Sequence, residues 1–159
     1  MALGGNLAGD FASCEALLEA ALARFPRAGL GVVARSSWWR SAAWPDPSAP
    51  EYRNGIALVE ADQGPAAVLQ ALLAIETDLG RTRSAKNAPR TLDLDLIAYG
   101  RQVIDTPGLV LPHPRAHERR FVMGPLAELL PGWRHPVLGR TAVELAAEAP
   151  VGRDAEPVR

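Results

Sequence analysis

The run Leu92-Asp93-Leu94-Asp95-Leu96 constrains the fold of this 159-residue chain more than any other feature. Alternation of apolar and acidic residues is typical of a half-buried β-strand, and it predicts a strand over 91–100. Because successive side chains of a strand point to opposite faces, the leucines face a core. Both carboxylates then share the other face, with their Cα atoms about 6.6 Å apart. The sequence therefore predicts a sheet that is buried on one face and carries two acids on the other.

The remaining elements follow from periodicity and from turn residues. An apolar stripe at helical spacing predicts a helix over 11–25, with Asp10 as its cap; the stripe consists of Cys14, Leu17, Leu18, Ala21, Leu22 and Phe25. We expect further helices over 64–79, 118–130 and 141–147, and strands over 2–4, 30–40, 54–61 and 102–104. This order predicts an α+β fold, a ferredoxin-like sandwich in which helices flank an antiparallel sheet.

Composition narrows the class of protein. The formal net charge of −1 argues against a general nucleic-acid coat or a membrane-surface binder, because both need a basic face. No apolar run reaches the length of a bilayer span, and no secretory signal is visible. The single Cys14 excludes an internal disulfide. We therefore expect a cytoplasmic protein with one domain over 1–147 and a flexible tail over 148–159.

The acidic pair suggests phosphate chemistry. Asp93 and Asp95 would suit a hard divalent cation that also binds phosphate oxygens. Arg81, Arg83 and Arg90 precede them in a segment of loop composition, and guanidinium groups stabilise the charge that develops during phosphoryl transfer. Two alternatives stay open: the aspartates form a solvated strand face, or the arginines only pair with them.

Other motifs are weaker or absent. No phosphate-binding loop of the P-loop type and no Gly-x-Ser-x-Gly elbow occurs, and the glycines at 4, 5 and 9 predict only a turn. His113 is either a donor to phosphate or an ordinary loop residue, and its spacing to His117 is a weak metal signal. An aromatic slot for a flat heterocycle would use Tyr52, Asn54 and Phe121, although core packing explains each aromatic equally well.

At these residues the chain resembles the 6-hydroxymethyl-7,8-dihydropterin pyrophosphokinases of folate biosynthesis. The similarity is collinear over nearly the whole chain. It includes Ala2-Leu-Gly-Gly-Asn-Leu7, Trp39-Arg-Ser41, Tyr52-Arg-Asn54, Gly80-Arg-Thr-Arg83, Pro89-Arg-Thr-Leu-Asp-Leu-Asp-Leu96, Leu111-Pro-His113 and Arg119-Arg-Phe121.

The resemblance implies an ATP- and Mg²⁺-dependent enzyme that moves the terminal diphosphate of ATP to a reduced pterin and releases AMP. It assigns two Mg²⁺ ions to Asp93 and Asp95, and closure over the phosphates to Arg81 and Arg90. It assigns ATP contacts to Glu76, Arg83, Leu96, His113 and Arg119. Contacts with the pterin fall to Ser41, Trp44, Tyr52, Asn54 and Phe121. The implied partners are small molecules and the implied state is a monomer.

The chain departs from the family pattern in three places. Asn87-Ala88 stands where the family has Gly preceded by Trp, Pro45 lies in the loop beside the pterin residues, and the first strand is short because the sequence begins at Met1-Ala2. A different class of function remains open, a ligand-binding module on the same scaffold without catalysis. The two metal-type carboxylates argue against it, since binding alone has little need of them.

Overall fold

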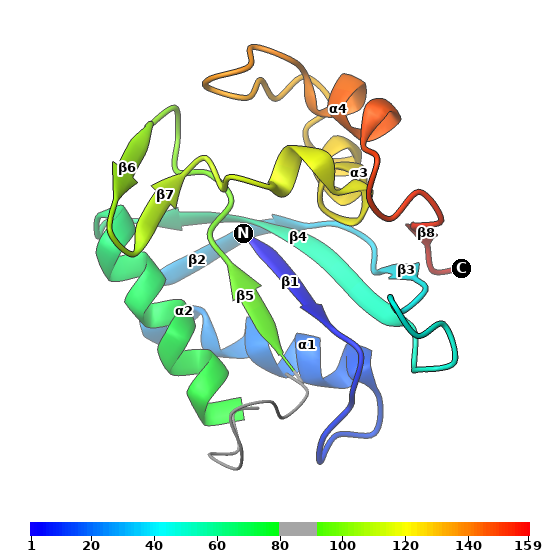
Figure 1. The fold of residues 1–159 in the computed structure, drawn as a ribbon. Coiled ribbons are helices and arrows are strands. Elements are labelled where there is room, and N and C mark those ends of the chain that lie inside the picture. Colours follow the sequence, from blue (N-terminus) through cyan, green and yellow to red (C-terminus); the bar gives the residue numbers. More distant parts are fainter. Residues whose placement is uncertain (80–91) are drawn as a thin grey trace.

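The computed structural model describes residues 1–79 and 92–159 of the chain. Within these residues, six strands form one antiparallel sheet in the order β5–β1–β4–β3–β8, and β2 pairs with the other half of β4 (Figure 1). The strands are β1 (Ala2–Gly5), β2 (Leu30–Arg35), β3 (Trp39–Ser41), β4 (Tyr52–Ala61), β5 (Asp93–Asp95) and β8 (Glu156–Pro157). The α+β class and the antiparallel sheet expected from the sequence are confirmed.

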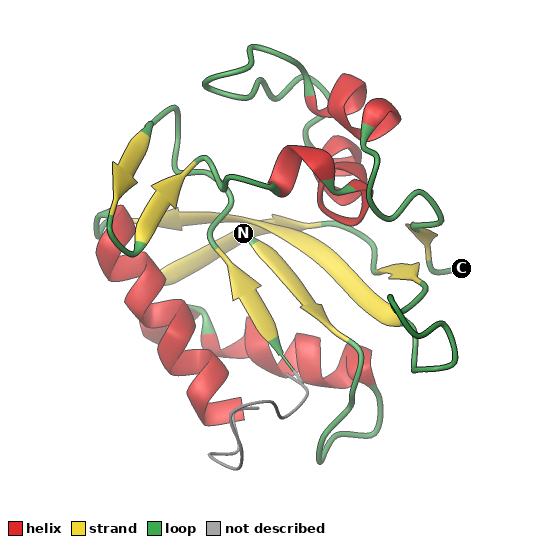
Figure 2. Cartoon of the chain, viewed as in Figure 1, coloured by secondary structure: helices red, strands yellow, loops and turns green. Residues whose placement is uncertain are grey.

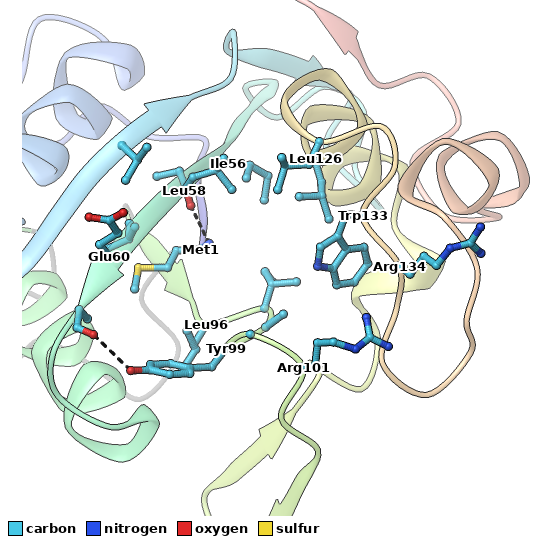
Figure 3. A pocket seen from close by; sticks show the side chains of 18 of the residues that line it. Met1, Ile56, Leu58, Glu60, Leu96, Tyr99, Arg101, Leu126, Trp133 and Arg134 are labelled. Atoms are coloured by element: carbon cyan, nitrogen blue, oxygen red, sulfur yellow. Dashed lines mark hydrogen bonds between the residues drawn. The ribbon is translucent and has the colours of Figure 1, made fainter.

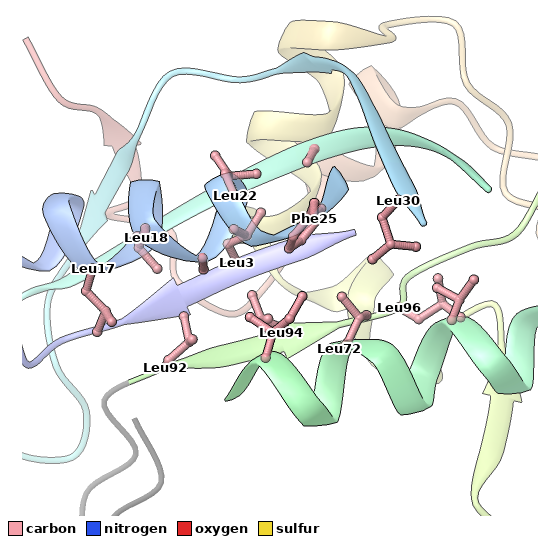
Figure 4. Close-up of a cluster of buried hydrophobic side chains, with 14 of the residues drawn as sticks. Leu3, Leu17, Leu18, Leu22, Phe25, Leu30, Leu72, Leu92, Leu94 and Leu96 are labelled. Carbon is pink, nitrogen blue, oxygen red and sulfur yellow. The ribbon is translucent and has the colours of Figure 1, made fainter. Parts of the chain in front are cut away.

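Two helices, α1 (Cys14–Arg24) and α2 (Pro65–Leu79), cover one face of this sheet (Figure 2). Their apolar stripes meet the leucines of β1 and β5 in the larger core (Figure 4); its fully or almost fully buried members include Leu3, Leu17, Leu18, Phe25, Leu72 and Leu94. Burial of each large apolar side chain contributes about 1.5–3 kcal/mol, so this cluster stabilises the packing of α1 and α2 on the sheet.

The first helix begins later than predicted. Its N-cap is Ser13, whose hydroxyl accepts a hydrogen bond from the amide of Ala16, so the expectation of an Asp10 cap was wrong. Periodicity located the helix correctly because the stripe is a property of the helix itself. The cap depends on where the preceding loop turns, which periodicity does not specify.

The opposite face is covered only in part. Helix α3 (Arg120–Leu129) packs on β3 and β4, and α4 (Ala142–Glu148) packs on α3. A second apolar cluster joins these helices to the sheet through Ile56, Val122, Met123, Leu126 and Leu145. Thr141 caps α4 and forms a capping box with Glu144. Helix α3 lies to one side of β1 and β5 and does not cover the part of this face that these two strands form (Figure 1).

Two strand predictions need correction. The strand expected over 30–40 is interrupted at 36–38, although β2 and β3 both pair with β4. The strand expected over 91–100 extends only over β5, because its ladder with β1 runs from the pair Gly4–Asp93 to the pair Ala2–Asp95. Alternation marks the pleat of a segment, but strand length depends on how long a neighbour lies alongside.

The return strand predicted over 102–104 is also wrong. Strands β6 (Ile104–Thr106) and β7 (Leu109–Leu111) form a separate two-stranded hairpin instead. Its two-residue loop is Pro107-Gly108, and Gly108 has a φ of 83°, a conformation that glycine adopts without strain. This turn dipeptide was the signal that could have located the hairpin.

The chain continues through a short 3₁₀ turn, η2 (Ala116–Glu118), to α3, and after α4 it returns to the sheet. The segment predicted as a flexible tail is 148–159. Glu148 ends α4, and residues 149–159 run beside the start of α3 and place β8 against β3. Ala155 in this segment is buried. Among the described residues, no helix has the length and apolarity that a bilayer crossing requires.

Candidate active site on the open face of the sheet

The two aspartates of β5 lie on the face opposite the larger core. Leu94 between them is buried in that core, so Asp93 and Asp95 point the other way. Their cross-strand neighbours on β1 are Gly4 and Ala2. These neighbours have little or no side chain, and they leave room beside the carboxylates for ions or a ligand.

A buried carboxylate fixes the position of this strand. The backbone amide of Leu94 donates a 2.7 Å hydrogen bond to Oε1 of Glu76, a residue of α2 that is 4% exposed. A hydrogen bond to a charged acceptor contributes about 1.5–3 kcal/mol. Glu76 therefore ties β5 to α2 from below, while Asp93 and Asp95 face the other side of the sheet.

Strand register places Asn54 in the same row as Asp93. Gly4 of β1 pairs with Asp93 on one side and with Asn54 of β4 on the other. A Cβ atom on Gly4 would lie 2.6 Å from Oδ1 of Asn54, so the absence of a side chain lets the amide lie over β1. Two residues earlier on the same face, Tyr52 pairs with Ser41 of β3.

His113 stands near the aspartates with a defined ring orientation. Its amide donates to the carbonyl of Ile97 at 2.8 Å, and its Nδ1 accepts from the amide of Arg115 at 3.2 Å. Burial lowers the pKa of His113, the negative charge of Asp95 opposes this shift, and the positive charge of Arg119 adds to it. With Nδ1 acting as an acceptor, the neutral ring carries its proton on Nε2 and can donate it to a ligand.

The start of α3 supplies an aromatic ring and a cation. Arg119 precedes the helix, and its guanidinium carbon lies 5.9 Å from the centre of the Phe121 ring. Phe121 is partly exposed and packs against the second apolar cluster, which also contains Ile56 of β4. The ring and the cation therefore belong to the same face of the sheet as Asn54.

Most of the residues predicted for the site are brought together on this face, although they are distant in sequence; they are Ser41, Tyr52, Asn54, Asp93, Asp95, His113, Arg119 and Phe121. Trp44 lies apart, 87% exposed in the loop over 42–51, and Glu76 and Leu96 are buried in the layer below. Arg81, Arg83 and Arg90 lie outside the described residues.

His113 and His117, whose spacing gave the weak metal signal, have different neighbours. His117 packs edge-on against His135, with ring centres 5.6 Å apart, whereas His113 faces Asp95 and Arg119. Among residues 1–79 and 92–159, no group of three or more His, Cys, Asp or Glu side chains could hold a metal ion. The candidate donors for a cation are therefore two carboxylates that a ligand's own oxygens would supplement.

A large cavity lies at the other end of the same face (Figure 3). Its volume is about 820 Å³, and its lining includes Ile56, Leu58, Leu126 and Trp133. Met1 also lines it, and the α-amino group of Met1 donates a hydrogen bond to the carbonyl of Ala57 at 2.9 Å. Burial lowers the pKa of this amine to about 5, and nearby Asp95 opposes the shift. Of the predicted site residues that the structure describes, Leu96 alone lines this cavity. The cavity and the polar residues around Asp93 and Asn54 therefore occupy different parts of the face.

Sequence reasoning missed several residues that shape the site. The strand expected over 2–4 extends to Gly5, so Gly5, for which only a turn was predicted, belongs to β1 together with Gly4. Trp39 lies in the row of Asn54, and its indole donates to Glu128 of α3 at 2.9 Å. The small residues at alternate positions 2 and 4 were a readable signal of an open face, whereas nothing local in the sequence indicates the contact between Trp39 and Glu128.

Comparisons with known proteins identify the family to which this chain is similar. A family model described as "7,8-dihydro-6-hydroxymethylpterin-pyrophosphokinase (HPPK)" matches residues 1–131. Three curated relatives carry the name 2-amino-4-hydroxy-6-hydroxymethyldihydropteridine pyrophosphokinase. The chain is 43% identical to the Synechocystis sp. protein over 144 residues, which cover 90% of this chain and 71% of that protein. It is 40% identical to the Pseudomonas aeruginosa protein (94% and 90% covered) and 40% identical to the Methylorubrum extorquens protein (82% and 81% covered).

Proposed function

Because the chain belongs to the 7,8-dihydro-6-hydroxymethylpterin-pyrophosphokinase family, we propose that it transfers diphosphate from ATP to 6-hydroxymethyl-7,8-dihydropterin in folate biosynthesis. In this reaction the hydroxymethyl oxygen bonds to the β-phosphorus of ATP and the hydroxyl loses its proton. The bond from that phosphorus to the oxygen of the α-phosphate breaks, and AMP leaves. The observation that carries the proposal is the row Asp93–Gly4–Asn54, which sets a cation-binding carboxylate beside an amide suited to a heterocycle.

The phosphate end of the site would lie around β5. Asp93 and Asp95 offer hard oxygen donors, and this set fits Mg²⁺, which proteins hold through one or two carboxylates together with substrate phosphates. When bound, Mg²⁺ would neutralise phosphate charge. His113 would donate from Nε2 to a phosphate oxygen, and Arg119 would supply positive charge beside it. The proposed phosphate roles of Arg81, Arg83 and Arg90 rest on the resemblance alone.

The pterin end would lie between β4 and the start of α3. Phe121 offers a partly exposed ring, and Tyr52 offers a second one at the same face of β4. Asn54 would hydrogen-bond the amide edge of the pterin ring, and a heterocycle without that edge would leave the amide unpaired. Ser41 lies next to Tyr52 in the register, and Trp44 stands in the following loop, from which we propose that it contacts the pterin.

The element order supports the ferredoxin-like description of the fold. The chain runs through β1, α1, β2 with β3, β4, α2 and β5, and both β1 and β4 are central in an antiparallel sheet. With α1 and α2 on a single face, this order supports our proposal of the split β-α-β arrangement. We propose that residues 1–147 form the pyrophosphokinase domain as one unit.

The test is AMP formation by the purified chain. ATP, Mg²⁺ and 6-hydroxymethyl-7,8-dihydropterin are mixed with the enzyme, and AMP is quantified with and without the pterin. We expect AMP that depends on the pterin. Asp95→Asn should abolish it while leaving the unfolding midpoint close to that of the wild type, and Asp105→Asn on the exposed β6 serves as a matched control. ADP in place of AMP would contradict diphosphate transfer. A folded chain that binds ATP but forms no AMP would instead be a binding module.

A further inference from the structure

The C-terminal segment, residues 149–158, crosses from the start of α3 to β3 and is hydrogen-bonded at both ends. The amide of Arg120 donates to the carbonyl of Val151 at 2.9 Å. The amide of Val151 donates to the carbonyl of Glu118 at 3.0 Å. At its other end, β8 pairs with β3, and the amide of Val158 donates to the carbonyl of Trp38 at 2.8 Å. The segment therefore joins two elements that both border the proposed pterin site.

Gly152 in this segment lies directly against the Phe121 ring. A Cβ atom at this position would be 2.6 Å from Cδ1 and 3.2 Å from Cε1 of the ring. The φ of Gly152 is 70°, so any other residue is also strained in its backbone. The backbone of the C-terminal segment thus forms a wall behind Phe121, and it approaches more closely than a side chain would allow.

Asp154, two residues later, binds the loop on the other side of the proposed pterin site. Its Oδ2 accepts a 2.6 Å hydrogen bond from the amide of Ala42, the first residue after β3. Ala42 opens the loop that carries Trp44 and leads to Tyr52. The next residue, Ala155, is buried, and its carbonyl accepts a hydrogen bond from Nε of Arg120. One short segment therefore contacts Phe121 at one border and the loop at the other.

We propose that Gly152 and Asp154 are positioning residues that set the spacing between Phe121 and the loop over 42–51, and so the fit of the pterin. The proposal rests on the proposed function. The family model ends at residue 131, so this wall of the site is built by a part of the chain beyond the family match. The strand register and hydrogen bonds given above join neither residue to Asp93, Asp95 or His113. Of the proposed ATP residues, Arg119 pairs with Val151 and lies 5.9 Å from the Phe121 ring, so we expect a smaller effect on ATP than on the pterin.

The experiment compares Gly152→Ala with Gly139→Ala. Both glycines have a positive φ, 70° and 68°, but a Cβ atom at Gly139 would meet nothing within 4 Å. The backbone strain is therefore matched, and only Gly152→Ala displaces the Phe121 ring. We expect Gly152→Ala to raise the KM for the pterin about tenfold and to change the KM for ATP less than about twofold. Gly139→Ala should leave both constants near the wild-type values.

Asp154→Ala provides a second test, because this exposed residue is not part of either core. We expect a rise in the pterin KM of about threefold, with the ATP KM unchanged. Pterin affinity measured directly, by quenching of pterin fluorescence in the presence of a non-hydrolysable ATP analogue, should weaken in parallel. If Gly152→Ala fails to fold, Asp154→Ala decides alone.

The outcomes separate this inference from the function on which it rests. If the wild type forms AMP but neither variant changes pterin binding, or if the KM for ATP rises equally, the positioning role is wrong and the enzyme assignment stands. If the wild type forms no pterin-dependent AMP, the proposed function fails, and the positioning role fails with it.

Discussion

Gly124 gives the most direct test of how α3 is seated on the sheet. A Cβ atom at this position would lie 2.5 Å from Cζ3, 2.6 Å from Cη2 and 3.2 Å from Cε3 of Trp39. The indole cannot easily retreat, because it is 8% exposed and its Nε1 is hydrogen-bonded to Glu128. We therefore expect Gly124→Ala to destabilise the protein, although alanine is the better residue for a helix.

The magnitude follows from two opposing contributions. Replacing glycine by alanine inside a helix stabilises by about 1 kcal/mol. Overpacking a well-filled interior costs about 1–3 kcal/mol, and a ring held on two sides places this site at the upper end of that range. The net effect is a loss of about 1–2 kcal/mol in the free energy of unfolding. For a domain of this size the midpoint of thermal unfolding should fall by about 3–6 °C.

The assay is equilibrium unfolding in urea together with thermal unfolding, followed by circular dichroism. Gly132→Ala is the control, because a Cβ atom there meets nothing within 4 Å. Trp39→Phe replaces the indole that the new methyl group would contact, so Gly124→Ala should lower the free energy of unfolding by less in the Trp39→Phe variant than in the wild type. Gly124→Ala at or above wild-type stability, or an equal penalty with and without the indole, would refute the packing argument.

Three further predictions concern the site and its supports. Gly4→Ala should displace the Asn54 amide and raise the pterin KM about tenfold, measured by the AMP assay, while the ATP KM stays constant. Glu76→Leu should lose about 1–3 kcal/mol in urea unfolding, because the buried amide of Leu94 is left unpaired, whereas Glu76→Gln keeps an acceptor; equal losses would contradict this. Burial would raise the pKa of Glu128, but hydrogen bonds from an amide, a hydroxyl and an indole hold it below its ordinary value of 4.5. The ionised Glu128 carboxylate therefore stabilises the folded protein above pH 4.5, and this stabilisation is lost as the pH falls through the pKa of the folded state. The difference in Tm between wild type and Glu128→Gln should shrink in acid. A difference that stays constant with pH would contradict this role of Glu128.

The helices and strands that the sequence predicted correctly are those marked by several residues of one period. The stripe of α1 is buried as expected, except that Cys14 is only partly buried, and Leu94 enters the core while Asp93 and Asp95 do not. The hairpin of β6 and β7 was missed because its strands have three residues each, too few to show alternation. Short elements are specified by their turns and by their partners more than by their own pattern.

The sequence by itself indicated the family, through a collinear resemblance to its members, and the α+β class, through local spacing. The roles of the polar residues stay predictions. Only the tertiary structure decided that Gly4 admits the Asn54 amide, that Trp39 fills the space over Gly124, and that Gly152 stands behind Phe121. Each of these contacts joins residues that are far apart in the chain. Their distances are set by strand register and by the packing of α3 on the sheet, which depend on every neighbour at once and leave no local periodicity to read.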